Sequence, residues 1–245
     1  MSVRGAAMRA GVIGLVAAGV ISGATGDYGD AEDDTNIPIS PPNWSFLVWV
    51  PIYLGAFVFA AAQALRPWRG DPAVARIRVS FAASVLLSGL WVRTARRPAL
   101  EVAVVGATAT TALIAQFRGA RTTPSSPRER NRRRESARTW FFEVPVGLFA
   151  GWITLATVVA TSQALVEKGL SALLRPRWSA SLLLAAGAAG AVVTRRTRGV
   201  AYPLTLVWGL FGVAMKERSR TPVVARSAVA AGAAIATAVF NRPRE

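Results

Sequence analysis

The chain has 245 residues, of which 52% are hydrophobic and only 17% are charged, and its mean hydropathy is +0.36. Soluble domains carry about 25% charged residues, so this composition argues against a water-soluble protein, although the net charge of +16 alone would suggest a nucleic-acid binder. The absence of His and Cys excludes Ser–His and Cys–His nucleophiles, zinc sites and disulfides.

Apolar segments follow one another along the chain. A bilayer core about 30 Å thick requires roughly 20 apolar residues per helix. Eight segments meet or approach this length, over residues 6–25, 44–65, 77–93, 98–117, 139–164, 178–194, 200–216 and 222–240. We therefore predict an all-α, polytopic transmembrane helix bundle of about eight spans, in which residues 1–245 form a single integral membrane domain.

The first segment has two interpretations. Arg4 and Arg9 precede an apolar stretch from Ala10 to Ile21, a pattern that also fits a signal peptide. The stretch that follows, residues 22–25, is a poor cleavage site, so we favour a retained helix.

Basic residues are distributed unevenly between the predicted loops. With the N-terminus inside, 19 of the 29 Lys and Arg residues fall on the cytoplasmic side, as the positive-inside rule requires. The acidic stretch over residues 27–34 then falls outside. Both termini are therefore predicted to be cytoplasmic.

An Arg-rich stretch over residues 118–138 separates the fourth and fifth predicted spans. It combines Pro, Ser and eight Arg without apolar periodicity, which predicts a solvated cytoplasmic linker between two four-helix halves, 1–117 and 139–245. Each basic residue near a membrane surface gains roughly 1 kcal/mol from anionic lipids, so we expect this linker to contact anionic lipids of the bilayer. Stacking aromatic residues do not alternate with the Arg residues, so we expect no nucleic-acid partner.

The stretch over residues 37–53, IPISPPNWSFLVWVPIY, is the most informative in the chain. Its prolines and aromatic residues of interest are Pro41, Pro42, Trp44, Phe46, Trp49 and Tyr53. The proline pair favours extended backbone ahead of the second span. Phe46, Trp49 and Tyr53 stand at i, i+3 and i+7 and share one helix face. Trp44 fits an aromatic belt at the membrane interface, whereas Trp49 and Tyr53 lie about 7 and 13 Å deeper at 1.5 Å per residue.

This stretch resembles the signature of the tryptophan-rich sensory protein family (TspO/MBR, or translocator family), with its Pro-Pro, Trp, Phe and second Trp. Three further stretches are similar to helices of that family: Leu90–Trp91, Pro145–Thr157 and Tyr202–Gly212. The chain departs from the compact five-helix members in its eight predicted spans. The resemblance implies a longer multi-helix member in the plasma membrane of a prokaryote, with a sensory or regulatory function.

The resemblance also implies a pocket for a hydrophobic ligand such as a tetrapyrrole. Its expected residues are Pro41, Pro42, Trp44, Phe46, Trp49, Tyr53 and Trp152. Pro145, Phe149, Trp152 and Ala156 form a stripe that could provide the second wall, and ordinary packing is the alternative for every one of these positions. The chain requires no cofactor, and without His or Cys it could recognise a tetrapyrrole only by stacking, shape and Arg–propionate pairing.

Two acids, Glu101 and Glu143, fall within predicted spans, where an ionisable group suggests a function. Each lies within a turn of its span's start, so a partner such as Arg97 or Arg138 is the simpler interpretation.

Gly147 and Gly151 form a G-x-x-x-G motif that predicts a helix-contact face. A homodimer interface is the alternative for the same motif.

Three function classes stay open at this point: a TspO-like ligand-binding protein, a small-solute transporter and a structural membrane protein. The transporter is suggested by the two halves and by a faint inverted similarity between residues 44–65 and 140–165. An enzyme is not expected, because the chain lacks His and Cys and has only two acids within its predicted spans.

Overall fold

The computed structural model describes residues 3–24, 37–94, 97–120 and 136–242, and these residues form helices and turns without a strand. The main helices are α1 (Val3–Ala24), α3 (Trp49–Ala62), α4 (Pro72–Trp91), α5 (Pro98–Ala120), α7 (Val144–Glu167), α8 (Pro176–Arg196), α9 (Ala201–Glu217) and α10 (Pro222–Phe240), of which those that could cross a membrane follow from length and apolar content. In the described part, seven helical segments are long and apolar enough for this, and α9 is shorter, with 17 residues. The predicted all-α membrane bundle is confirmed.

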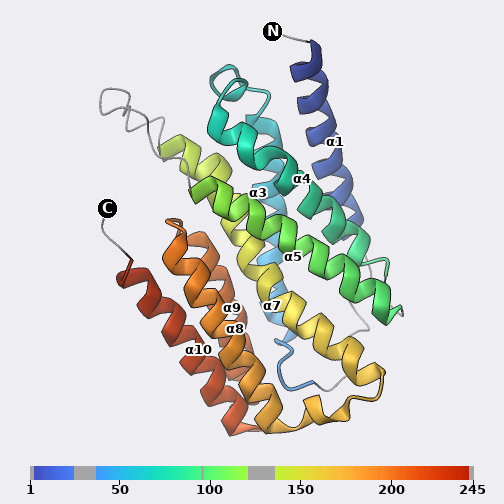
Figure 1. The fold of residues 1–245 in the computed structure, drawn as a ribbon, viewed down its shortest axis with the longest axis vertical. Helices are drawn as coiled ribbons and strands as arrows, with labels where there is room; N and C mark the ends of the chain where they lie inside the picture. The colour runs from blue at the N-terminus through green and yellow to red at the C-terminus, as the bar shows by residue number, and fades with distance from the viewer. Residues whose placement is uncertain (1–2, 25–36, 95–96, 121–135, 243–245) are drawn as a thin grey trace.

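The first five long helices close into a ring. α1 packs against α4, α4 against α5, α5 against α7, α7 against α3, and α3 against α1. The last three, α8, α9 and α10, pack on one another and join the ring mainly through α9 on α7 (Figure 1). α7 therefore contacts both groups. Whether the first helix is retained or is a signal peptide stays a prediction.

α1 begins and α10 ends at their upper ends in Figure 1, and we call this side of the bundle the terminal end. Residues 37–48 lie at the opposite end, which we call the loop end. Which end faces the cytoplasm stays a prediction, as does the division into halves 1–117 and 139–245. The acidic stretch 27–34 and residues 121–135 of the Arg-rich linker lie outside the described residues.

α4 begins at Pro72 rather than at residue 77, so the predicted start of this span is wrong. The Asp71 side chain accepts hydrogen bonds from the backbone N–H groups of Ala73 and Val74, at 2.8 and 3.2 Å. Pro72 fits the first helical position because that residue needs no donor. The capping signal starts the helix five residues ahead of the predicted segment, so residues 72–76 are helical as well.

The G-x-x-x-G motif of α7 is a contact face, as predicted, and α9 of the same chain occupies it. A Cβ atom on Gly151 would lie 2.3 Å from the backbone oxygen of Tyr202. One on Gly147 would lie 2.9 Å from Cβ of Ala201. Only glycine permits this close approach of the two helices.

One face of the second span is apolar and exposed. The side chains on this face are between 63% and 67% exposed: Leu47, Val50, Leu54 and Phe57. The opposite face is buried in the ring and includes Trp49, Ile52, Ala56 and Phe59. An exposed apolar stripe of this length is the surface expected where a helix meets lipid.

Candidate functional site

Four of the predicted ligand-binding residues come together at the loop end, on the turn η1 (Asn43–Val48) and on α3 and α7. Trp49 stacks on Tyr53, with ring centroids 5.1 Å apart and planes at 21°. Trp49 also meets Phe149 and Trp152 edge to face, each with ring centroids 6.3 Å apart. Phe46 packs against Trp152 at 5.4 Å. We call these five residues the aromatic cluster.

Helical spacing explains the cluster. Trp49 and Tyr53 are four residues apart on α3, so they share a face and can stack. Phe149 and Trp152 are three apart on α7 and belong to the stripe predicted as a second wall. α3 and α7 approach closely because Gly55 lies against Pro145, where an added Cβ would be 3.3 Å from the proline's Cβ.

Burial divides the cluster into inner and outer members. Trp49 is 7% exposed and Trp152 only 2%, as expected for tryptophans deep in a span. Tyr53 and Phe46 are half-buried, so they form its outer edge. The cluster thus combines one stacked and three edge-to-face ring contacts in an apolar setting, the chemistry typical of ligand pockets.

The structure places the other predicted residues against α9 instead. Trp44 is 40% exposed and contacts Trp208 and Phe211 edge to face, at 5.3 and 6.0 Å. Pro42 lies beside Gly212, where a Cβ would be 3.1 Å from the proline's Cδ. Pro41 is buried. These residues support the turn that leads into the aromatic cluster.

α9 also makes polar contacts with this turn. The indole N–H of Trp208 donates to the backbone oxygen of Ser45 at 3.0 Å. The ammonium of Lys216 donates to the backbone oxygen of Ser40 at 3.3 Å. An indole N–H that is partly buried gains from a hydrogen-bond partner, but the sequence gave no signal that the partner of Trp208 lies on η1.

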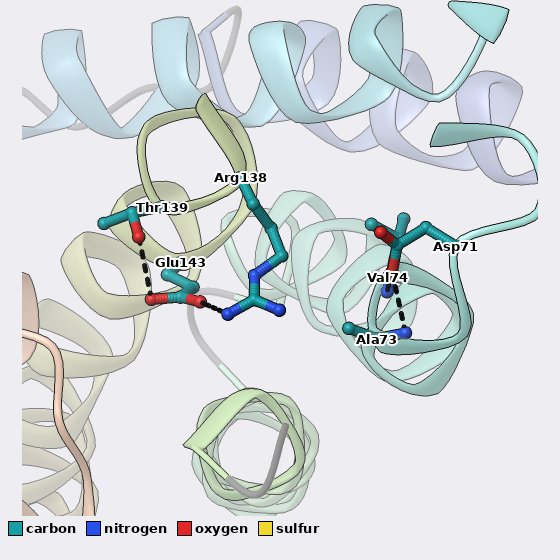
Figure 2. Close-up of polar contacts among 6 residues, drawn as sticks. All are labelled: Asp71, Ala73, Val74, Arg138, Thr139 and Glu143. Carbon is teal, nitrogen blue, oxygen red and sulfur yellow. Dashed lines mark hydrogen bonds and ion pairs between the residues drawn. The ribbon is translucent and has the colours of Figure 1, made fainter. Parts of the chain in front are cut away.

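A second feature lies at the terminal end, where α7 begins. Arg138 and Glu143 form an ion pair, with Nη2 and Oε1 3.2 Å apart, and the hydroxyl of Thr139 donates to Glu143 Oε2 at 3.3 Å (Figure 2). The predicted pairing of Glu143 is confirmed. Thr139 and Glu143 are the first and last residues of a π-helical turn, and Arg138 is the residue that precedes it. Pro145 follows and lacks the N–H that a regular α-helix would use there, which fits a widened turn.

The ion pair borders a cleft of about 230 Å³ between α5, the π turn and the loop from α8 to α9. Its polar lining consists of Gln116, Arg138, Thr139, Glu143 and Arg198. The cleft is smaller than the 300–1,000 Å³ typical of pockets for drug-sized ligands. Sequence reasoning singled out Glu143 but missed Gln116 and Arg198, because only the fold brings α5 and the α8–α9 loop beside it.

Glu101 has a partner that differs from the expectation. It accepts a hydrogen bond from the indole N–H of Trp91 at 3.2 Å, rather than pairing with Arg97. Trp68 is 4% exposed and packs edge to face on Phe142 at 5.3 Å, close to the ion pair.

The described residues contain no group of three or more acidic, His or Cys side chains that could hold a metal ion. Comparison with known families finds a match to the model of a family described as TSPO-like protein, over residues 6–241. No curated protein and no solved structure matches the chain.

Proposed function

Because this chain belongs to the family of TSPO-like proteins, we propose that it binds a hydrophobic ligand at the aromatic cluster. Its role is sensory or regulatory rather than enzymatic. The single observation that supports this most is the contact of Trp49 with Tyr53, Phe149 and Trp152. Anchoring at the membrane interface does not explain two indoles and a phenol at this depth, because it places such rings at the ends of spans.

A flat, apolar ligand such as a porphyrin suits this arrangement. Aromatic rings prefer offset-stacked or edge-to-face contacts, and a porphyrin placed beside Trp49 would receive the first from Trp49 and the second from Trp152. Recognition then rests on stacking and shape, because the chain has neither His nor Cys to ligate a bound iron.

Entry of such a ligand requires a local rearrangement, since the rings already touch. Tyr53 is the residue that would move, because it is half-buried and stacks on the face of Trp49. A Cβ atom on Gly23 would lie 2.2 Å from the Tyr53 hydroxyl oxygen, so the end of α1 covers this ring. Displacement of Tyr53 would therefore push on α1, which couples ligand binding to a helix movement and supports a sensory role.

Titration of the purified protein with a porphyrin tests the proposal through tryptophan fluorescence. The expected result is saturable quenching with about one porphyrin per chain. Quenching that rises linearly with porphyrin concentration and does not saturate would refute it.

A small-solute transporter is the second candidate, and the polar cleft beside Glu143 is the observation that favours it. An ionisable group inside a span commonly marks a solute pathway, and α7 carries both the cleft and the aromatic cluster. Flux in proteoliposomes discriminates between the two functions.

A purely structural role is a third possibility, and it predicts that Trp49→Leu leaves the function unchanged.

We further propose the plasma membrane of a prokaryote as the location.

A further inference from the structure

Among the described residues, Arg78 of α4 is a buried charge without a counterion. Its side chain is 5% exposed. Within the described part of the chain, neither Nε nor Nη2 of its guanidinium has a hydrogen-bond partner. An arginine stays protonated in proteins, and a buried charge is costly unless it is paired and hydrogen-bonded. The site therefore needs an anion, and the described residues do not supply one.

The acids that the structure describes are all placed elsewhere. Asp71 caps the start of α4, and Glu143 pairs with Arg138. Glu101 accepts from Trp91 at the loop end. Glu167 and Glu217 end α7 and α9, also at the loop end. A protein carboxylate from these segments is thus not available to the guanidinium.

A second positive charge, Arg9, makes the need for an anion greater. Arg9 of α1, half-buried, is close enough for its positive charge to act on Arg78. α1 and α4 run in the same direction (Figure 1) and pack closely, since a Cβ on Gly89 would lie 2.6 Å from the backbone oxygen of Gly19. The hydroxyl of Ser22 donates to the oxygen of Gly89 at 2.8 Å, which fixes this register. Two like charges are therefore held side by side at the terminal end.

We propose that Arg9 and Arg78 bind a phosphate group at the junction of α1 and α4. Guanidinium groups match the geometry of phosphate oxygens, and two of them around one phosphate replace mutual repulsion by two charge-assisted contacts. Arg78 lies six residues after Pro72, about 9 Å along the helix at 1.5 Å per residue. That depth suits a phosphate at the boundary between headgroups and acyl chains.

A neighbouring groove favours a phospholipid as the source of the phosphate. It has a volume of about 400 Å³ and is lined by Ala75, Arg76, Val79 and Arg118. Val79 is 55% exposed, so the groove has an apolar wall that an acyl chain could cover. A further pair of arginines at its edge suits a negatively charged headgroup.

Thermal unfolding of the full chain, purified in a neutral detergent and stripped of lipid, tests the proposal. Phosphatidylglycerol, phosphatidylcholine and inorganic phosphate are added separately. We expect saturating phosphatidylglycerol to raise the apparent melting temperature of the wild type by about 5 °C. Arg78→Gln and Arg9→Gln should each lose most of this shift. Arg226→Gln, which removes an exposed arginine of α10, is the matched control and should keep it.

Arg78→Met protects the test against a variant that merely misfolds. This variant should be at least as stable as the wild type without lipid, because it removes the unpaired charge, and it should not respond to phosphatidylglycerol. Inorganic phosphate could raise the melting temperature of the wild type as much as phosphatidylglycerol does. If Arg78→Gln abolished that shift, the site would stand and would be assigned to free phosphate. The proposal would be overturned by an equal shift in the wild type and Arg78→Gln, or by no shift with phosphatidylglycerol or inorganic phosphate.

Discussion

The indole N–H of Trp208 donates a hydrogen bond to the backbone oxygen of Ser45 at 3.0 Å, across 163 positions of the sequence. Trp208 belongs to α9, in the group of three helices that follows the ring. Ser45 belongs to η1, the turn from which α3 and its aromatic residues continue. The last three helices therefore help to position the predicted ligand site rather than merely extending the bundle.

Replacing Trp208 with Phe should destabilise the protein through loss of this bond. Trp208 is 38% exposed, so the bond is partly buried, and a hydrogen bond within a protein contributes about 1 kcal/mol net. This corresponds to a fall of about 2–4 °C in the melting temperature of a chain of this size. Thermal unfolding in detergent measures the change. Trp178→Phe is the control, because Trp178 is 55% exposed. Equal falls in the two variants would mean that the bond contributes nothing specific.

A side chain on Gly151 should separate α7 from α9. The Cβ of Gly151→Val would meet the backbone oxygen of Tyr202, which cannot move without shifting α9. Overpacking of this kind lowers the free energy of unfolding by about 1–3 kcal/mol. The loss should lie near the upper limit, because the two helix backbones can no longer approach closely. Gly106→Val on α5 is the matched control, since no atom lies within 4 Å of its added Cβ. Unfolding at the same temperature in both variants would contradict the α7–α9 contact.

Sequence patterns predicted the spans well and the boundaries less well. Hydropathy located α10 at residues 222–240, as the structure has it, because lipid imposes a length on every apolar helix. It missed residues 72–76 of α4, because the Asp71–Pro72 start signal outweighs the cost of a charge, Arg76, inside the first turns of the helix. Caps, rather than apolar content, decide where a helix begins.

The candidate site was predictable where its residues share a helix. The i, i+4 spacing of Trp49 and Tyr53 places them on one face of any helix, so their stacking follows from sequence. The contact of Trp49 with Trp152 depends on how α3 and α7 pack, which one sequence does not specify. The contact between Trp208 and Ser45 had no local signal at all.

The ion pair at the start of α7 should contribute a measurable but small coupling free energy. Arg138 and Glu143 have side chains 20% and 26% exposed, so solvent weakens their attraction. A double-mutant cycle with Arg138→Gln and Glu143→Gln should give a coupling free energy of about 0.5–1 kcal/mol. The measurement is the free energy of unfolding of the four proteins. Strict additivity of the two substitutions would show that the pair does not form.

Asp71 should matter as the cap of α4. Asp71→Ala removes the acceptor for two backbone N–H groups and should lower the free energy of unfolding by about 1 kcal/mol. Asp71→Ser keeps a capping oxygen and should retain most of the stability, so the two variants together separate capping from loss of charge. Equal destabilisation by Ala and Ser in chemical unfolding would argue against the cap.

The most direct test of ligand binding compares two double variants that leave the same number of tryptophans. Trp49→Phe with Trp152→Phe changes the aromatic cluster, whereas Trp140→Phe with Trp178→Phe changes two residues that are 67% and 55% exposed. The dissociation constant for a porphyrin is measured for both by equilibrium titration. We predict that the cluster variant binds at least tenfold more weakly, a loss of about 1.4 kcal/mol, and that the surface variant matches the wild type. Equal affinity in both would place the ligand elsewhere.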